Sequence, residues 1–280
     1  MAISRAVLIT GCSSGIGRAT ALLLHQAGLP VWATARDTGT LAELAARGIR
    51  TLRLDVTDEE SAAAAVKEVA DTHGAVGVLG NNAGSGVHGA VEDVPLDTVR
   101  GSFETNLFGA LRLTQLVLPG MRQQGAGRIV NISSILGRLS PPGGGLYQAT
   151  KYATEAYADA LRLEVAQFGV HVSLIEPATV RTRFYETAIM QFAGASDSAY
   201  QAFYDRLAAW AIDVHEGRTR AGRLAVPPEK VAAAVERAVL ARRPRARYPV
   251  GPLARGALGL RRVLPDGLFD RFVAREFPTP

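Results

Sequence analysis

Short apolar segments alternate along the chain with longer stretches in which apolar residues recur every three or four positions. Six of the short segments have the length and aliphatic composition of strands: residues 6–10, 30–35, 50–54, 77–80, 128–132 and 170–175. Helical spacing is found over 18–26, 60–70, 97–118 and 145–168. This alternation predicts an α/β fold, a single doubly wound Rossmann-type parallel sheet with helices on both faces. A length of 280 residues suits one such domain, residues 1–280.

Two regions after the last of these strands have a different pattern. Residues 183–225 are amphipathic and hold seven of the chain's 18 aromatic residues, which favours a large apolar pocket: Phe184, Tyr185, Phe192, Tyr200, Phe203, Tyr204 and Trp210. A further helix should begin at Pro227-Pro228-Glu229, since proline is tolerated in a first turn. Residues 241–280 form a basic amphipathic C-terminal extension. That extension could touch an anionic membrane surface weakly, but packing on its own domain or on a partner subunit is the favoured interpretation.

Composition excludes several classes of protein. Hydrophobic residues make up 48% of the chain, and no apolar run approaches the roughly 20 residues of a membrane-spanning helix. The apolar run Ala6–Ile9 is too short for a signal-peptide core, so we expect a cytoplasmic protein. Cys12 is the only cysteine, which rules out an intrachain disulfide and a thiolate metal cluster, and we expect no metal.

The net charge of +5 comes from the C-terminal extension, residues 241–280, which we call the tail. Residues 241–280 carry nine arginines against three acids, while residues 1–240 carry 22 basic and 23 acidic side chains. The main domain is therefore neutral, and it has no helix-turn-helix or RNA-binding signature. We expect no nucleic-acid partner.

A glycine-rich motif separates the first strand from the first helix. Its residues are Thr10, Gly11, Cys12, Ser13, Ser14, Gly15, Ile16 and Gly17. Glycine permits a tight turn and a close approach of the backbone to a pyrophosphate, whose charge is stabilised at a helix N-terminus. The order of strand, glycine turn and helix favours a dinucleotide site over a turn without a ligand, although the spacing differs from Gly-x-Gly-x-x-Gly.

The ends of the next strands supply further candidate cofactor contacts. Arg36 follows the second strand, where a cation favours NADP(H) by pairing with its 2′-phosphate. Asp37 would favour NAD(H) if the strand ended one or two residues later, and both could be ordinary loop charges. Asp55 and Val56 follow the third strand. After the fourth strand, small residues leave room for a cofactor across the sheet edge: Asn82, Ala83 and Gly84.

A candidate acid/base pair lies on the predicted helix 145–168. Tyr147 and Lys151 are four residues apart, so one helical turn places them on the same face. A nearby ammonium stabilises a phenolate, and the pKa of Tyr147 should fall toward the working range. Ser134, at the end of a strand, could hydrogen-bond the same reacting oxygen. The pair alone is a weak signal, because Tyr and Lys fall four apart on many helices by chance.

Together, these motifs resemble the short-chain dehydrogenase/reductase family in order and spacing over roughly residues 4–182. The resemblance is carried by Thr10–Gly17, Asn81–Gly84, Asn106, Ser134, Tyr147 and Lys151. It implies a catalytic tetrad of Asn106, Ser134, Tyr147 and Lys151. Tyr147 would be the general acid/base, Ser134 the polarising hydroxyl, and Lys151 the activator of Tyr147 and a ribose ligand. Asn106 would hold a water that links Lys151 to solvent.

The resemblance also suggests roles for residues near the sixth strand. Ser133 is an alternative to Ser134, although the family's spacing to Tyr147 favours Ser134. Pro177 belongs to the cofactor site, and Val180 and Thr182 correspond to positions that hold the nicotinamide carboxamide. Ala178 stands where relatives usually carry glycine, and it would be strained if that position needs a positive φ.

The expected function is therefore an NADP(H)-dependent oxidoreductase that interconverts a ketone and a secondary alcohol, with the hydride coming from the nicotinamide. Residues 183–225 would be the substrate lid. The tail and the glycine loop look most like the branch with 17β-hydroxysteroid and retinol dehydrogenases, which suggests a lipophilic substrate. A 3-oxoacyl-carrier reductase and a non-catalytic NADP-binding sensor are the alternatives. The family habit implies a homodimer or homotetramer.

Overall fold

A parallel sheet of seven strands forms the centre of the molecule. The computed structural model describes residues 3–182 and 198–280. The strands follow the order β3-β2-β1-β4-β5-β6-β7, and every neighbouring pair is parallel. Their bounds are β1 Val7–Ile9, β2 Val31–Ala35, β3 Arg50–Arg53, β4 Val78–Asn81, β5 Gly127–Ile132, β6 Val170–Pro177 and β7 Arg247–Val250. The predicted doubly wound parallel sheet is confirmed.

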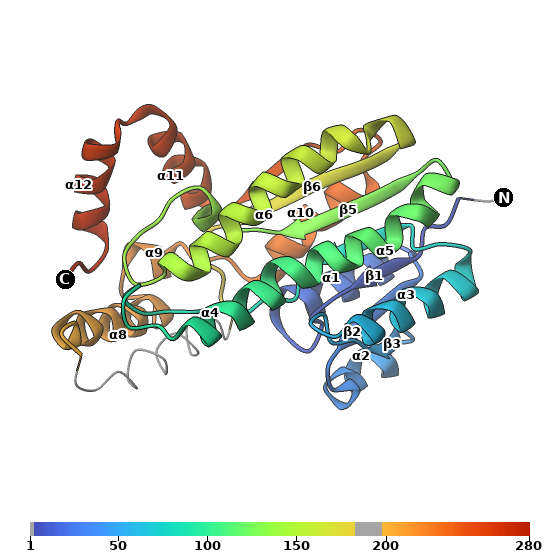
Figure 1. The fold of residues 1–280 in the computed structure, drawn as a ribbon, viewed down its shortest axis with the longest axis horizontal. Coiled ribbons are helices and arrows are strands. Elements are labelled where there is room, and N and C mark those ends of the chain that lie inside the picture. The colour runs from blue at the N-terminus through green and yellow to red at the C-terminus, as the bar shows by residue number, and fades with distance from the viewer. Residues whose placement is uncertain (1–2, 183–197) are drawn as a thin grey trace.

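Helices cover both faces of the sheet (Figure 1). Helix α1 (Gly15–Gln26), the short α2 (Ala42–Ala46) and α10 (Pro228–Leu240) bury apolar side chains in the core on one face. Helices α3 (Glu59–His73), α5 (Gly109–Gln123) and α6 (Gly145–Glu164) enclose the core on the other face. Because both faces are covered, β1, β2 and β4 are buried along their whole length.

Local signals placed several helix ends correctly. The side chain of Asp58 accepts a hydrogen bond from the N–H of Ser61 and caps α3, as a helix-capping acid should. Helix α10 begins at Pro228, where its missing N–H costs nothing.

The structure differs from the sequence prediction in three elements. The C-terminal extension begins with a strand, β7, that was not predicted; it pairs with β6 at the sheet edge, where Pro249 is tolerated. The predicted helix 97–118 is divided into α4 (Leu96–Phe103), a π-helical turn η2 (Glu104–Phe108) and α5. The predicted helix 145–168 ends at Glu164 and continues only as the 3₁₀ turn η4 (Ala166–Phe168).

The remaining helices gather at one end of the molecule, away from the N-terminus (Figure 1). They are α8 (Gln201–His215), α9 (Arg220–Arg223), α11 (Pro252–Val263) and α12 (Asp266–Glu276). This end lies beyond the carboxyl ends of the strands, where parallel sheets bind ligands. Within the described ranges, no helix combines the length and the apolar composition that crossing a bilayer requires.

Candidate active site

The glycine motif forms a tight turn between β1 and α1. Gly11 and Gly15 adopt φ values of +69° and +54°, which favour glycine. A Cβ on Gly17 would overlap the carbonyl oxygen of Gly11, so only glycine fits there. Ser13 and Ser14 are exposed, and no side chain caps the N-terminus of α1. Free N–H groups at the start of a 12-residue helix suit a phosphate.

Residues after β4 brace this turn. Asn82 donates from Nδ2 to the carbonyl oxygens of Thr10 (2.8 Å) and Gly11 (3.0 Å). The hydroxyl of Thr10 accepts hydrogen bonds from the N–H groups of Asn82 (2.9 Å) and Ala83 (2.8 Å). The sequence suggested that the small residues 82–84 leave room for a ligand. The structure adds that Asn82 holds the glycine turn in place.

Arg36, Asp37 and Asp55 lie at the carboxyl ends of β2 and β3. The exposed Arg36 side chain makes neither a hydrogen bond nor an ion pair within residues 3–182 and 198–280, and is therefore available to an anion. Asp37 instead caps its own turn by accepting the N–H of Gly39 at 2.8 Å. Burial opposes the ionisation of Asp55, but hydrogen bonds from Thr57 and the nearby Arg36 charge outweigh it and lower the pKa of Asp55. Val56 is buried beneath this edge.

Tyr147 and Lys151 lie one turn apart on α6, and both side chains are buried. The Lys151 ammonium is 5.7 Å from the centre of the Tyr147 ring and donates a hydrogen bond to the carbonyl oxygen of Ile132 at 2.9 Å. Burial lowers the pKa of Lys151 to about 8, partly opposed by the negative charge of Glu155. Lys151 is therefore still mainly cationic at neutral pH.

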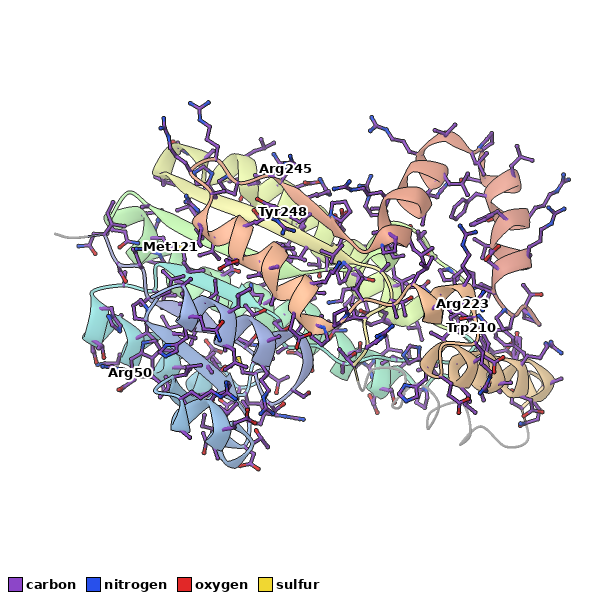
Figure 2. All side chains as sticks on the ribbon, turned by 180° about the vertical axis from the view of Figure 1, so that it is seen from behind. Arg50, Met121, Trp210, Arg223, Arg245 and Tyr248 are labelled. Atoms are coloured by element: carbon purple, nitrogen blue, oxygen red, sulfur yellow. The ribbon has the colours of Figure 1, made fainter. Side chains whose placement is uncertain are left out.

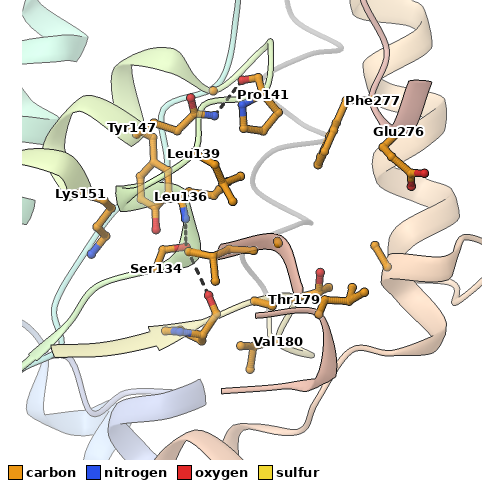
Figure 3. Close-up of a pocket in the computed structure, with 18 of the residues that line it drawn as sticks. Ser134, Leu136, Leu139, Pro141, Tyr147, Lys151, Thr179, Val180, Glu276 and Phe277 are labelled. Carbon is orange, nitrogen blue, oxygen red and sulfur yellow. Dashed lines mark hydrogen bonds between the residues drawn. The ribbon is translucent and has the colours of Figure 1, made fainter. Parts of the chain in front are cut away.

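The hydroxyls of Ser133 and Ser134 have different partners. Ser133 donates to the carboxylate of Glu155 at 2.5 Å, a buried contact with α6. Ser134 donates to the carbonyl oxygen of Pro177 at 3.4 Å and accepts the N–H of Leu136 at 3.1 Å. Figure 3 shows Ser134 and Tyr147 on the wall of one cavity. Of the two serines, only Ser134 keeps a weakly bonded hydroxyl close to Tyr147.

Asn106 occupies the π-helical turn η2, a type of distortion that is frequent at functional sites. Its side chain accepts the N–H of Ser85 at 2.7 Å and donates to the Ser85 carbonyl oxygen at 2.9 Å and to the Thr150 hydroxyl at 3.1 Å. These bonds join the segment after β4 to α6. The hydrogen bonds of the Asn106 side chain do not include Lys151 in the part of the chain described, so a water relay between them stays a prediction.

The segment after β6 returns toward the glycine turn. Pro177 ends β6, and Ala178 donates its N–H to Val250, which continues the pairing with β7. Val180 bridges to Val226, and a Cβ on Gly15 would lie 3.3 Å from the methyl group of Thr182. Thr182 is therefore next to the glycine turn, as a shared cofactor site requires.

A cavity of about 610 Å³ joins these residues. Tyr147, Ser134 and Lys151 lie on one wall, and Ile16, Gly84 and Thr182 line the end near the glycine turn. The opposite walls come from α8, α11, α12 and the residues after α12, with apolar side chains that include Leu207, Trp210, Leu260, Phe269, Phe272 and Phe277. Most of the lining is apolar; polar groups lie around Tyr147, and Arg220 and Glu276 also line the cavity.

Helix α8 and the last residues of the tail contact each other beside the cavity. The rings of Trp210 on α8 and Phe277 are in contact, with their centres 5.3 Å apart and their planes tilted by 49°, and Arg206 donates to the Thr279 carbonyl oxygen. Figure 2 labels Trp210 on the part of α8 near the C-terminal helices. The apolar side of the tail also packs on the domain, since Phe269 and Val273 form one core with Leu139. Three aromatics of the predicted lid, Phe184, Tyr185 and Phe192, lie outside the described residues.

Sequence reasoning missed two polar residues of the cavity, His88 and Gln148. The His88 ring centre lies 6.3 Å from that of Tyr147, and burial lowers the pKa of His88 to about 4, so its imidazole is neutral. Gln148 is buried and donates to the Pro141 carbonyl oxygen at 2.9 Å. Gln148 could have been suspected from its position next to Tyr147, but no local pattern marks His88.

Comparisons with known proteins agree with this geometry. The family model for short chain dehydrogenases matches residues 5–191. The chain is 36% identical over 272 residues to the uncharacterized oxidoreductase YbbO of Escherichia coli K12, covering 97% of this chain and 94% of that one. It is 36% identical to mouse retinol dehydrogenase 5 (98% and 89% covered) and 36% identical to the 3-ketodihydrosphingosine reductase of Bacteroides thetaiotaomicron (88% of each covered).

Solved structures show the same fold. A short-chain dehydrogenase from Streptomyces avermitilis superposes with a TM-score of 0.79 at 34% identity, covering 97% of this chain and 94% of that one. A short chain dehydrogenase/reductase from Burkholderia phymatum, in complex with NAD, superposes with a TM-score of 0.78 at 26% identity, covering 100% and 99%.

Proposed function

The chain belongs to the short-chain dehydrogenase family, and from that premise we propose an NADP(H)-dependent enzyme that interconverts a lipophilic ketone and its secondary alcohol. The observation that carries this proposal is the cavity itself. Tyr147, Lys151 and Ser134 lie on one of its walls, and the glycine turn lies at one end. A substrate bound against the apolar walls of the cavity would have its reacting oxygen next to Tyr147 and Ser134 and close to the cofactor site.

The nicotinamide cofactor supplies the hydride when it is bound, and the protein supplies position and protons. In the reducing direction, the Tyr147 hydroxyl donates its proton to the substrate oxygen. The Ser134 hydroxyl donates a hydrogen bond to the same oxygen, in place of its long bond to Pro177. Both interactions grow stronger as negative charge develops on the substrate oxygen, which is the condition for lowering the barrier.

Lys151 keeps a positive charge close to Tyr147. The phenolate that remains after proton transfer is stabilised by this ammonium, and burial of both side chains strengthens their interaction. Lys151 is also available to the cofactor ribose, the role that the family resemblance implies. Since its pKa is about 8, the stabilising charge is present at neutral pH and is lost as the pH rises above that value.

We assign the preference for NADP(H) to Arg36. Its guanidinium is exposed at the carboxyl end of β2, whereas the competing Asp37 is engaged as a cap. A cation at this position pairs with the 2′-phosphate that distinguishes NADP(H) from NAD(H). The neighbour from Burkholderia phymatum was solved with NAD, so the two cofactors must be compared directly in this enzyme.

The proposed substrate is lipophilic. The walls away from Tyr147 are mostly apolar and aromatic, with Arg220 and Glu276 as charged members, which favours a large hydrophobic ketone or alcohol such as a steroid, a retinoid or a long-chain lipid. Two of the relatives carry names that specify lipophilic compounds, retinol and 3-ketodihydrosphingosine. A 3-oxoacyl-carrier reductase remains the second candidate, because the arginine-rich tail next to the cavity could meet an acidic carrier.

Consumption of NADPH with a panel of ketones tests the proposal. We expect turnover with hydrophobic ketones, weaker turnover with small water-soluble ones, and a higher KM for NADH than for NADPH. Preference for 3-oxoacyl thioesters would select the carrier reductase. Cofactor binding without turnover of any ketone or thioester would select the non-catalytic sensor instead.

Assembly and location remain predictions from the sequence. We propose a homodimer or homotetramer in the cytoplasm, to be checked by light scattering and by fractionation. Phe269 and Val273 of the tail pack on Leu139 of the domain, which supports packing of the tail on its own domain over contact with a membrane surface.

A further inference from the structure

A cluster of charged residues around two buried carboxylates, Glu155 and Glu176, lies next to Ser134, between α6 and the last two strands. Its central member is Glu176, the residue before Pro177 at the end of β6, whose side chain is 0% exposed. The Glu176 carboxylate is 3.5 Å from the guanidinium of Arg247 on β7 and 3.6 Å from that of Arg138, and it makes no hydrogen bond with the residues described. A buried carboxylate without a hydrogen bond is costly, so the site needs an explanation.

The other acids of the cluster continue the line of Tyr147 and Lys151 along α6. Glu155 lies one turn beyond Lys151, and Asp159 lies one turn further. Arg247 pairs with both, at 3.0 Å from the Glu155 carboxylate and 2.6 Å from the Asp159 carboxylate. The second oxygen of Glu155 accepts the hydroxyl of Ser133 at 2.5 Å. The cluster is thus bonded directly to the residue before Ser134.

Three contacts link Ser134 and its neighbours to this cluster. Ser133, on its N-terminal side, is bonded to Glu155. Arg138 follows the 3₁₀ turn η3 (Ile135–Gly137), which Ser134 caps, and it pairs with Glu176. The Ser134 hydroxyl itself meets the carbonyl oxygen of Pro177, the residue after Glu176. Glu176 and Glu155 are therefore both linked to the segment that carries the Ser134 hydroxyl.

Three acids, Glu155, Asp159 and Glu176, share Arg247, and Asp159 also pairs with Arg162 at 3.0 Å. Burial, and then the negative charge of Glu155, raise the pKa of Glu176 to about 7, against the opposing charges of Arg138 and Arg247. The groups that face Glu176 are thus Glu155 from α6, Arg138 from the turn after η3, and Arg247 from β7. Close to neutral pH, Glu176 exchanges between its neutral and its charged form.

We propose that Glu176 is a positioning residue for the Ser134 hydroxyl and that it acts in its protonated form. When neutral, Glu176 leaves Arg247 to Glu155 and Asp159, and Ser133 stays bonded to Glu155. When ionised, it repels Glu155, draws Arg247 away from Glu155 and draws Arg138 toward itself, which shifts the turn that carries Ser134. This inference rests on the proposed function, because it assumes that Ser134 hydrogen-bonds the substrate oxygen.

Glu176→Gln tests the idea by fixing the neutral form. At pH 6 we expect its kcat to lie within about twofold of the wild-type value, with the KM for NADPH unchanged. Between pH 6 and pH 8.5 the ratio of the variant's kcat to that of the wild type should rise by about threefold or more, since only the wild type gains the charge. Glu164→Gln, an exposed acid at the end of α6, is the matched control and should keep a constant ratio.

Glu155→Ala tests the link to the serine. It removes the acceptor of Ser133, so kcat should fall about tenfold without a change in the KM for NADPH. A constant ratio of Glu176→Gln to wild type across pH, or an equal loss of kcat and NADPH affinity in Glu155→Ala, would overturn the proposal.

Thermal unfolding supplies a readout that needs no substrate. The pKa of Glu176 rises from 4.5 to about 7 on folding, so the folded chain holds a proton over this interval that the unfolded chain releases. The contribution of Glu176 to the stability of the wild type therefore decreases as the pH rises from about 4.5 to about 7. The Tm of Glu176→Gln, relative to wild type, should be higher at pH 8 than at pH 5, and a pH-independent difference would contradict the protonated form. An absence of wild-type turnover with every ketone would instead refute the proposed function, and this thermal comparison would still decide whether Glu176 holds the proton.

Discussion

The two sides of the cavity are built by different means. The glycine side, Thr10–Gly17 with Asn82–Gly84, depends on main-chain geometry: positive φ at Gly11 and Gly15, and hydrogen bonds from Asn82 to backbone carbonyls. The helical side, α8 with α11 and α12, depends on contacts between side chains such as Trp210 and Phe277. The residues of the glycine side are close together or in register across the sheet, whereas those of the helical side come from segments far apart in the sequence.

This difference predicts how each side responds to change. Main-chain geometry has little room to relax, so a single added methyl group on the glycine side should disturb the fold and the cofactor site together. Side-chain walls are repacked more easily, so a substitution on the helical side should change the choice of substrate more than stability. Four substitutions distinguish the two sides, and the one at their boundary should reduce activity most.

Tyr147→Phe, at the boundary between the two sides, should have the largest effect. Without the hydroxyl there is no proton donor for the substrate oxygen, and kcat should fall by roughly 10²- to 10⁴-fold. Both sides of the cavity stay intact, so NADPH affinity, measured by fluorescence titration, should remain within about twofold. Tyr152→Phe, on the exposed side of the same helix, is the control and should match the wild type. Rates in Tyr147→Phe close to those of the wild type would refute the assigned role.

Gly17→Ala should damage the glycine side. Its Cβ would overlap the Gly11 carbonyl oxygen and the Asn82 amide, which the turn holds in place. We therefore expect the free energy of unfolding to fall by about 3 kcal/mol and the affinity for NADPH to fall as well. Gly101→Ala in α4, where a Cβ meets open space, should be neutral or slightly stabilising. Chemical denaturation measures both variants. Equal stability in the two would show that the glycine turn is less constrained than its contacts indicate.

Arg36→Ala should separate the two cofactors. Loss of a charge-assisted pair with the 2′-phosphate should raise the KM for NADPH roughly tenfold or more, and the KM for NADH should change little. Arg237→Ala, an exposed arginine on α10, controls for the loss of one positive charge. Equal changes in the two Michaelis constants would remove the 2′-phosphate assignment.

Trp210→Ala should have the smallest effect and the most selective one. Removing one ring of the Trp210–Phe277 contact removes apolar surface from the cavity wall, so the KM for a large ketone should rise roughly 3- to 10-fold, while the KM for a small ketone should be unchanged. Ile212→Ala, more exposed on α8, is the control. Steady-state kinetics with one bulky and one small ketone measure the difference. A comparable loss for both ketones would mean that Trp210 supports the fold and not the choice of substrate.

Much of the glycine side, and the pair of Tyr147 and Lys151, were predictable because their signals are local. The alternation of strands and helices, the glycine turn, and the four-residue spacing of Tyr147 and Lys151 are all contained in short segments, and backbone sterics and helical periodicity then determine the geometry. The sheet edge at which they meet follows from parallel pairing.

Other features were decided only by the tertiary structure. β7 forms because β6 offers an open edge, although its Arg-Tyr-Pro-Val sequence has no strand pattern. The family spacing favours Ser134 over Ser133, but the physical reason appears only in the structure, where the carboxylate of Glu155 engages Ser133 and leaves Ser134 near Tyr147. No local sequence pattern distinguishes His88 or Glu176, because their shifted pKa values come from burial among residues distant in the chain. Periodicity and glycine sterics act over a few residues and can be read directly from the sequence; burial and charge pairing depend on which segments meet, and only the folded chain determines that.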